Sequence, residues 1–412
     1  FYHNPKQFVS LAMGVQHPMD ATERLEAVTR YALEFNLQYP PQVVMLERKK
    51  NLLQARLLAK QCEQQEKQLH ENLPPSLQKV LRGKQLLVWK KLLERYEYDD
   101  MQVYDFMASG VKLTGMHDTP ACYPEKIRPA TLTQGDLEAS AVWRRKAIVG
   151  RKFLQKDPLH AAHLEETAAE ELDLGFLEGP FRSEAEVSAY FGHSHWMVVR
   201  RFVLVQGSEM KLRPIDDCLE SQLNQAYTST SYLKLQDLDY VTSLALRIAE
   251  AVSENRQKHG SGRWLGKCLD LSKAYKQMGI DPEQRHLAVI FFTKADGQPV
   301  FYVANALMFG ATAAVYAFNR VSRSLWFFAR TGPKGKPFER KFQVLGCTLD
   351  LTDVAQGVLV AENKPGRIDR LLMQLESIKA ANSISLHEAQ VLHGLMRYAC
   401  GFFSGQIGRA SC

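Results

Sequence analysis

The residue best placed to do chemistry is Asp270, near the end of the short apolar stretch Trp264–Leu271. This stretch predicts a strand, and a carboxylate at the end of a strand is held in one direction and can bind Mg²⁺. An aromatic residue, Tyr275, follows five positions later. By itself the pattern also fits a turn or a helix cap, where Asp is common.

Histidine and cysteine offer little further chemistry. Two histidine groups stand out, His160 with His163 and Glu166, and His193 with His195. The first has helical ligand spacing, but on an acidic helix it is more simply a solvated face, and we interpret the second as a loop pair. The seven cysteines are odd in number and widely spaced. This excludes a disulfide framework and a thiolate zinc site, and it fits a reducing compartment.

Composition and charge narrow the class of protein. The chain has 412 residues, of which 45% are hydrophobic and 24% charged, and this predicts a globular protein of two or three domains. No run approaches the roughly 18 apolar residues of a membrane span, so we expect no membrane partner. Because the chain starts at Phe1 and stops at Cys412, we interpret it as a piece of a longer protein.

The positive charge is concentrated in one region. Residues 43–95 contain 12 Lys or Arg and 5 Glu, a surplus as large as the net charge of +7 of the whole chain. This region is either a surface for nucleic acid or the solvated face of a helix, and the sequence leaves both readings open.

The element pattern changes along the chain. Residues 1–110 are predicted to be helical, with a break at Pro74-Pro75, and residues 117–135 to be a proline-rich linker. Beyond residue 175 we expect a strand at 196–205, a helix at 237–259, a hairpin of strands 288–292 and 300–303, and helices at 310–326, 368–380 and 385–403. A sheet built from hairpins with segregated helices predicts an α+β fold.

Five motifs occur in a specific order along the chain: Met210-Lys-Leu-Arg-Pro-Ile-Asp-Asp217 with Leu223-Asn224, Cys268-Leu-Asp-Leu-Ser-Lys-Ala-Tyr275, Asn305-Ala-Leu-Met-Phe-Gly310, Phe342-Gln-Val-Leu-Gly-Cys-Thr-Leu349, and 392–402 with 408–410. The series resembles the reverse transcriptases of retroelements (retrotransposons) over about residues 174–410, most specifically over 211–320. The first 170 residues carry no such resemblance.

The resemblance implies a right-hand polymerase fold with fingers, a palm and the start of a thumb or connection. It implies that Asp270 is the first catalytic carboxylate and a ligand of Mg²⁺. Among nucleotide-binding residues, it implies that Lys211 and Arg213 meet the triphosphate and that Tyr275 packs under the sugar and disfavours a ribose. Phe309 and Gly310 would support the template and the nucleotide.

The implied reaction is RNA-directed DNA synthesis, with nucleotidyl transfer to a primer 3′-OH. Its partners would be an RNA template, a DNA primer and deoxynucleoside triphosphates, in an intracellular compartment, cytoplasmic or nuclear. Each site residue also has an ordinary structural interpretation: solvated cations at a strand end for Lys211 and Arg213, a core aromatic for Tyr275, and a helix-start glycine for Gly310.

One essential motif of this family is missing. Its second palm carboxylate comes from a Tyr-x-Asp-Asp-like hairpin between the Gly310 helix and the Leu345-Gly346 strand. Here residues 324–341 contain no Asp, and their only acid is Glu339. We infer an internal deletion that impairs Mg²⁺ binding and catalysis, and that leaves the palm sheet weakened or rearranged. Tyr98-Asp99-Asp100 is no substitute, because it ends a helical stretch without flanking apolar strands.

Two alternatives remain open. Another acid could replace the missing carboxylate if it lay within about 4 Å of Asp270; the candidates are Asp216, Asp217, Asp350 and Asp353. Alternatively, the chain is a non-catalytic nucleic-acid-binding or scaffold protein derived from a retroelement, with residues 43–95 as its surface.

We therefore predict five regions. They are a helical N-terminal region (1–116), a linker with an acidic helix (117–173), fingers and palm (174–325), a truncated junction (326–341), and the end of the palm with the start of a thumb or connection (342–412).

Overall fold

The computed structural model describes residues 7, 25, 27–121, 123–151, 157–206, 210–233, 235, 238–254, 271–328, 340–344, 347–353, 359–363 and 365–400. The chain divides into two compact units. Unit 1 comprises Phe1–Lys50, Leu235–Asp270 and Pro333–Cys412, and unit 2 comprises Asn51–Lys234 and Leu271–Gly332.

Unit 2 is built on a five-stranded sheet with the order β3-β8-β7-β4-β5. Its strands are β3 (Leu177–Phe181), β8 (Pro299–Ala304), β7 (Val289–Thr293), β4 (Val198–Gln206) and β5 (Lys211–Asp216). The β4–β7 pairing is parallel, and the other pairings are antiparallel. The predicted hairpin is confirmed as β7–β8, and the predicted strand at 196–205 is confirmed as β4.

Both faces of this sheet are buried. Val289 and Phe291 of β7 pack into one apolar cluster, and Ile290 and Phe292 pack into the other. The first cluster contains residues of α8 (Gln134–Val149) and α10 (Glu184–Phe191), and the second contains residues of α9 (Pro158–Asp173). Because side chains alternate along a strand, burial on both faces explains the unbroken apolar runs of these strands.

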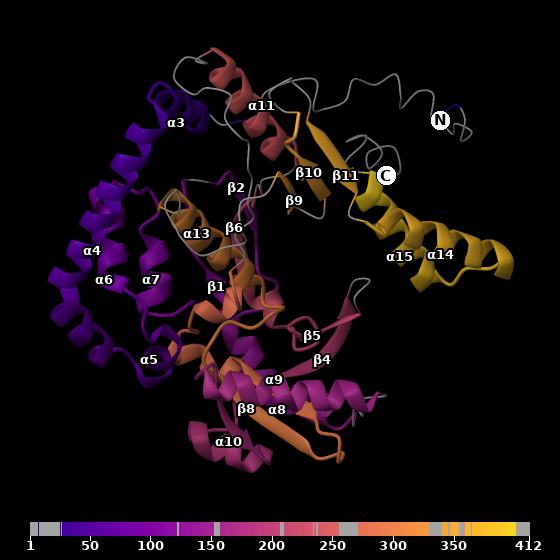
Figure 1. Ribbon diagram of the computed structural model, residues 1–412. Coiled ribbons are helices and arrows are strands. Elements are labelled where there is room, and N and C mark those ends of the chain that lie inside the picture. Colours follow the sequence, from indigo (N-terminus) through magenta and orange to yellow (C-terminus); the bar gives the residue numbers. More distant parts are fainter. Residues whose placement is uncertain are drawn as a thin grey trace. The chain divides into compact units, whose positions relative to one another are not determined.

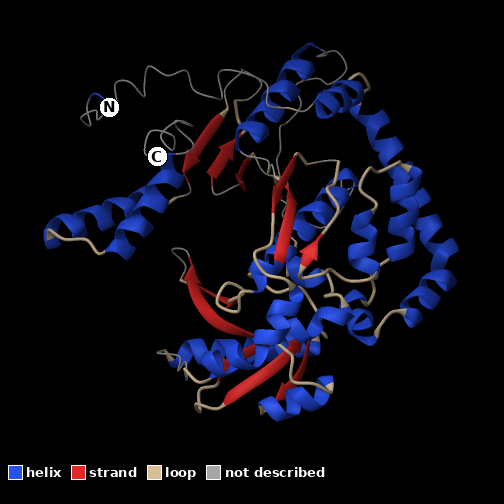
Figure 2. Ribbon diagram, turned by 180° about the vertical axis from the view of Figure 1, so that it is seen from behind, coloured by secondary structure: helices blue, strands red, loops and turns tan. Residues whose placement is uncertain are grey.

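The edge of the sheet continues as a two-stranded ribbon. β4 pairs with β7 only through Val198–Arg200, and from Arg201 to Gln206 it pairs with β5 alone. Figure 1 shows β4 and β5 running outward together, and Figure 2 shows the same curved ribbon from behind. Lys211 and Arg213 lie on β5, the outer strand of this ribbon.

The helices of residues 41–108 confirm the predicted helical region. They are α4 (Pro41–Asn72), α5 (Pro75–Leu81), α6 (Leu86–Arg95) and α7 (Gln102–Ala108). Pro74 follows the end of α4, and Pro75 is the first residue of α5. At that position a missing backbone N–H does not cost a hydrogen bond. The carboxylate of Glu66 on α4 accepts the first backbone N–H groups of α6, those of Leu86 and Leu87, at 2.7 and 2.8 Å.

The described residues between 115 and 173 form two short strands and two helices. They contribute β1 (Gly115–Met116) and β2 (Glu125–Arg128), which pair with β6 (Tyr227–Ser231) in a small sheet. They also contribute α8 and α9. Thr133 and Asp136 form a capping box at the start of α8, and Asp157 is the N-cap of α9. Both helices contact β4.

Unit 1 contains α3 (Ala27–Leu37), α11 (Leu238–Glu254), a sheet of order β11-β10-β9, and the helices α14 (Arg367–Ala381) and α15 (Leu386–Cys400). Its strands are β9 (Lys341–Val344), β10 (Cys347–Asp350) and β11 (Val360–Asn363). We expected a strand through Leu345-Gly346, and these two residues lie outside the described residues. On either side of them, β9 and β10 pair in antiparallel register, with Val344 opposite Cys347.

The architecture as a whole is mixed, with helices and largely antiparallel sheets, as the α+β prediction requires. The predicted strand 264–271 lies outside the described residues except for its last residue. Among the described helices, none is long and apolar enough to cross a membrane.

A buried ion pair joins α13 (Thr312–Phe328) to the α6–α7 connection. Arg320 and Asp100 are 3% and 4% exposed, and the Nε of Arg320 donates to Asp100 at 2.7 Å. Arg320 also donates to the side chain of Gln102 and the carbonyl of Asp118. Asp100 of the Tyr98-Asp99-Asp100 run is therefore a structural counter-charge in the interior.

We expect Asp100→Asn to lower the free energy of unfolding by about 3–5 kcal/mol, because Arg320 would keep a buried charge without its partner. Urea denaturation measures this change. Asp99→Asn is the matched control, since Asp99 is the exposed neighbour. It should change stability by less than about 0.5 kcal/mol, and equal losses in the two variants would contradict the role of the pair.

Candidate nucleotide-binding site

The predicted catalytic residue cannot be placed, because Asp270 lies outside the described residues. The described chain resumes at Leu271 and forms a short 3-10 helix, η2 (Ala274–Gln277), which carries Tyr275. The site can therefore be built only from the predicted nucleotide-binding residues and from what surrounds them.

Tyr275 and Phe309 form an aromatic pair. Their ring centroids lie 5.4 Å apart at an interplanar angle of 54°, and the ring of Tyr275 also meets Phe318 of α13 edge-on at 5.2 Å. Phe309 is 50% exposed, while Tyr275 is partly buried and burial raises the pKa of its hydroxyl. The pair thus has a fixed inner ring and a ring that reaches solvent.

Gly310 is required by close packing. Its φ is +141°, and a Cβ built there would lie 2.1 Å from the carbonyl oxygen of Asp216. The loop is fixed to the end of β5, because the N–H of Asp216 donates to the carbonyl of Phe309 at 3.0 Å and the N–H of Phe309 donates to Asp216 Oδ2 at 3.2 Å. This contact explains Gly310 without a ligand.

Asn224, which the motif contains without an assigned role, closes the same loop. Its Nδ2 donates to the carbonyl of Gly310 at 3.0 Å, and its Oδ1 accepts the N–H of Thr312 at 2.7 Å. Thr312 is the first residue of α13, so Asn224 satisfies one of the free N–H groups of that helix start.

Lys211 and Arg213 are exposed, and among the described residues no hydrogen bond or ion pair engages either side chain. They lie five and three residues before Asp216 on β5. Since side chains alternate along a strand, both lie on the face opposite that of Asp216, and Arg213 lies about 10 Å along the strand from it. The structure therefore brings Tyr275, Phe309 and Gly310 together at the Asp216 end of β5, while Lys211 and Arg213 lie farther along this strand on its opposite face.

Four buried charged side chains adjoin this site, because Asp216 bonds to Phe309 and Lys276 follows Tyr275 in the chain. Arg201 of β4 donates to Asp216 at 2.7 Å and to Glu171 of α9 at 2.9 Å, and Nζ of Lys276 lies 3.3 Å from Glu171. All four side chains belong to residues that are no more than 8% exposed. We call them the charge cluster; its net formal charge is zero.

Glu171 is the central acid of the charge cluster. Burial by itself would raise the pKa of its carboxyl, but the charges of Lys276 and Arg201 and their hydrogen bonds lower it to about 2. Burial by itself would lower the pKa of Arg201, but the negative charges of Asp216 and Glu171 raise it. The carboxylate therefore stays ionised throughout the physiological range.

The described acids do not form a Mg²⁺ site. Asp216 is paired with Arg201, Asp217 accepts from Arg200 at 3.0 Å, and Asp350 of unit 1 lies 2.7 Å from Nζ of Lys341. Within the described ranges, no three His, Cys, Asp or Glu side chains are grouped to hold a metal ion. The donor set does not fit Mg²⁺, and no reaction step through the metal follows from it.

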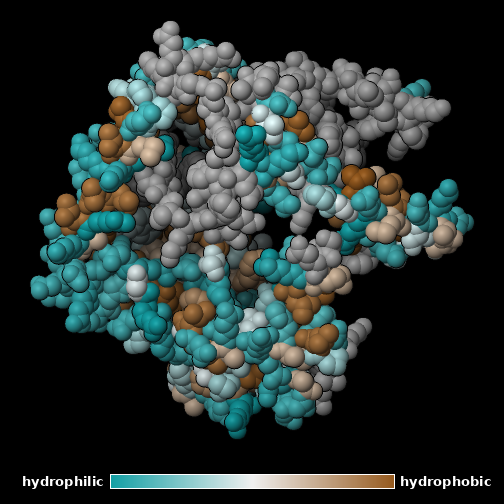
Figure 3. Space-filling view, viewed as in Figure 1, coloured by the Kyte–Doolittle hydropathy of each residue, from teal (hydrophilic) through white to brown (hydrophobic). Residues whose placement is uncertain are grey.

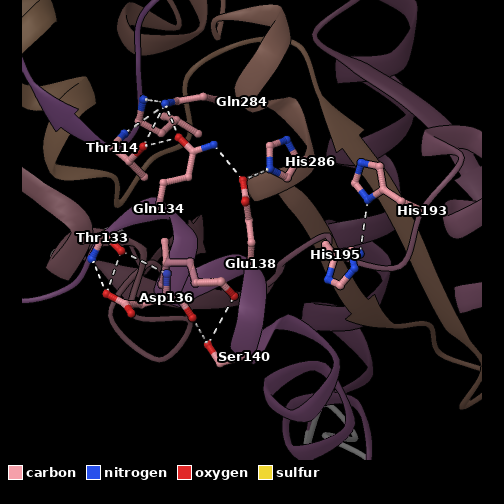
Figure 4. Close-up of polar contacts among 12 residues, drawn as sticks. Thr114, Thr133, Gln134, Asp136, Glu138, Ser140, His193, His195, Gln284 and His286 are labelled. Carbon is pink, nitrogen blue, oxygen red and sulfur yellow. Dashed lines mark hydrogen bonds and ion pairs between the residues drawn. The ribbon is translucent and has the colours of Figure 1, made fainter.

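His193, His195 and His286 lie in or beside a separate polar network, shown in Figure 4. It runs from Thr114 through Gln284 and Gln134 to Glu138, which lies 2.9 Å from Nε2 of His286. His193 packs beside His286, and its Nδ1 accepts the N–H of His195 at 3.2 Å.

A pocket of about 400 Å³ adjoins the start of this network, lined among others by Lys112, Met116 and Leu132. The carboxamides of Gln134 and Gln284 in its wall use their donors and acceptors within the protein. Few polar groups of this wall remain for a ligand, so we interpret it as structural.

The residues that the sequence did not reveal are Glu171, Arg201 and Lys276. The sequence predicts that Glu171 lies on an acidic helix, and a basic motif, Lys273-Ala-Tyr-Lys276, lies elsewhere in the chain. Complementary charge was the one signal that could have linked them, and it does not specify which acid meets which base.

Comparison with known proteins adds no identification. No model of a known protein family matches the chain, and no curated protein matches it.

We expect Glu171→Gln to remove part of the pH dependence of stability. The ionised carboxylate stabilises the folded state above its ordinary pKa of 4.5, and this contribution is lost as the pH falls through the folded value of about 2. It amounts to about 3 kcal/mol at neutral pH.

Urea denaturation of both proteins between about pH 7 and pH 3 measures this difference, which should be largest near neutrality and shrink below the ordinary pKa. Glu166→Gln, at an exposed position of the same helix, should follow the wild type. A wild-type advantage that stays constant over the whole range would contradict the assignment.

Proposed function

We propose that this chain is a reverse-transcriptase-family protein that binds nucleotide and nucleic acid but has little or no polymerase activity. The observation that carries the proposal is the assembly of Tyr275, Phe309 and Gly310 at the end of the strand that presents Lys211 and Arg213. The resemblance to reverse transcriptases implies that these five residues serve one ligand.

The chemistry of these groups suits a deoxynucleoside triphosphate. Lys211 and Arg213 have donors that are not used within the described structure, and cationic donors of this kind neutralise phosphate oxygens. Phe309, the half-exposed ring of the aromatic pair, offers an apolar ring face to a sugar or a base. A ring under the sugar disfavours a 2′-hydroxyl, so the site is expected to prefer deoxynucleotides over ribonucleotides.

The low polymerase activity that we propose follows from how the carboxylates are paired. Two-metal nucleotidyl transfer needs at least two carboxylates that share the metal ions. The described carboxylates near the site are paired with arginine, and the family's second carboxylate motif is absent from residues 324–341. The chain would then bind an RNA template and a DNA primer, but it would not extend the primer.

Arg213→Gln should weaken binding of a deoxynucleoside triphosphate about tenfold or more, because a charge-assisted hydrogen bond contributes about 1.5–3 kcal/mol. Equilibrium dialysis with dGTP and with GTP measures the affinity and the discrimination between them. Arg128→Gln is the control, since Arg128 is an exposed strand arginine on β2.

Wild-type protein that binds dGTP and GTP equally, or an Arg213→Gln variant that matches Arg128→Gln, would contradict the proposed site. Primer extension with Mg²⁺ provides the complementary measurement. Robust extension that Asp270→Asn abolishes would show that the chain is an active polymerase.

A second candidate function is nucleic-acid binding by a scaffold that performs no catalysis. The observation that favours it is α4, a helix of 32 residues, all of them described, of which only Cys62 and Glu66 are buried. Its exposed surface carries cations such as Lys49, Arg56 and Lys60. Figure 3 shows a largely hydrophilic surface over this helix, interrupted by apolar patches.

If α4 binds single-stranded RNA, replacing Lys49, Arg56 and Lys60 by Gln should flatten the salt dependence of binding. The slope of log K against log salt should fall by about 0.7 for each lost phosphate contact. Fluorescence anisotropy with a labelled RNA at several salt concentrations measures it. Replacing Arg128, Lys146 and Arg182 is the control, and an equal change in the two triple variants would exclude α4 as the surface.

A further inference from the structure

We propose that the C-terminal turn of α9 is a positioning element for the nucleotide site, with Glu171 as its central residue. Glu171 is ion-paired with Lys276 in the segment of Tyr275, and it is connected to the loop of Phe309 through Arg201 and Asp216. This inference rests on the proposed nucleotide site, and it adds to that site a residue that the motif order does not include.

The segment of Tyr275 has little structure of its own. η2 comprises four residues, and a single 3-10 turn has weak hydrogen-bond geometry. Lys273 before it lies at φ +50°, in the left-handed region that non-glycine residues seldom adopt. Contacts from outside the segment must therefore decide where the ring of Tyr275 lies.

The ring itself packs on Phe309 and Phe318, and the charged contacts of the segment come from two adjacent acids of α9. Lys273 lies 2.8 Å from Glu170, and Lys276 lies 3.3 Å from Glu171. The two lysines stand on either side of Tyr275 in the chain, so α9 holds this segment at both ends.

The two ion pairs differ in how strongly solvent screens them. The side chains of Glu170 and Lys273 are 58% and 31% exposed, and solvent screens such a pair strongly. Those of Glu171 and Lys276 are 8% and 10% exposed, and Glu171 also accepts from the buried Arg201. The inner pair therefore does most of the positioning.

The same carboxylate also acts on the second aromatic residue. Arg201 bridges Glu171 to Asp216, and Asp216 Oδ2 accepts the backbone N–H of Phe309. One connected set of ion pairs thus runs from the segment of Tyr275 through Glu171 to the loop of Phe309. We infer that it sets the distance between the two rings, and hence the width of the surface offered to a sugar.

A buried, net-neutral set of ion pairs is suited to this role. Such groups gain little stability over apolar packing of the same volume, but their directed hydrogen bonds admit few arrangements. A change at Glu171 should therefore alter the geometry of the site as well as stability, and a geometric readout can separate the two effects.

The experiment compares wild type, Glu171→Gln and the control Glu166→Gln by hydrogen exchange and by nucleotide binding. In Glu171→Gln, amides of residues 274–280 and 305–312 should exchange at least about tenfold faster, as expected if their local opening is eased. The preference for dGTP over GTP in equilibrium dialysis should fall severalfold. Glu166→Gln should match the wild type in both measurements.

Glu171→Asp provides a second variant in case the first fails to fold. It keeps the charge but shortens the reach by one methylene group, so both segments should exchange faster and the preference should fall, each less than in Glu171→Gln. Unchanged exchange and unchanged preference in a folded variant would overturn the inference and leave the proposed nucleotide site standing. Wild-type protein that binds neither nucleotide would overturn the proposed site, and the positioning role with it.

Discussion

The architecture of unit 2 depends on a set of four charges that can be buried only together. Arg201, Asp216, Glu171 and Lys276 come from two strands, a helix and a 3-10 turn, and their contacts are complete only when all these elements are in place. Moving any one charge out of water alone would cost several kcal/mol. The edge of the sheet, α9 and the Tyr275 segment are therefore expected to assemble cooperatively.

Acids in this chain serve repeatedly as structural counter-charges. Asp100 neutralises Arg320 and Asp216 neutralises Arg201, each inside the protein, while Asp217 pairs with Arg200. A carboxylate with an arginine partner has fewer lone pairs and less net charge to offer a metal ion. The proposed function therefore assigns ligand binding to the cations Lys211 and Arg213, and it assigns no Mg²⁺ to these paired acids.

Local patterns predicted the elements well where a single physical signal dominated. The two apolar runs at 288–292 and 300–303 predicted the β7–β8 hairpin, and Pro74-Pro75 predicted the break after α4. The pairing of β9 with β10, in which Val344 lies opposite Cys347, was not predicted. Periodicity of apolar residues indicates a strand but does not indicate which strand it pairs with.

The sequence by itself determined the element types, the α+β class and the order of motifs that bears the resemblance to reverse transcriptases. These depend on neighbours along the chain, through turn chemistry, capping and the alternation of apolar residues. Only the tertiary structure decided that Gly310 packs on Asp216, that Arg320 belongs with Asp100, and that Glu171 holds Lys276. Each of these contacts joins residues about 90 to 220 positions apart, and a charge or a glycine in the sequence carries no record of which distant partner will lie beside it.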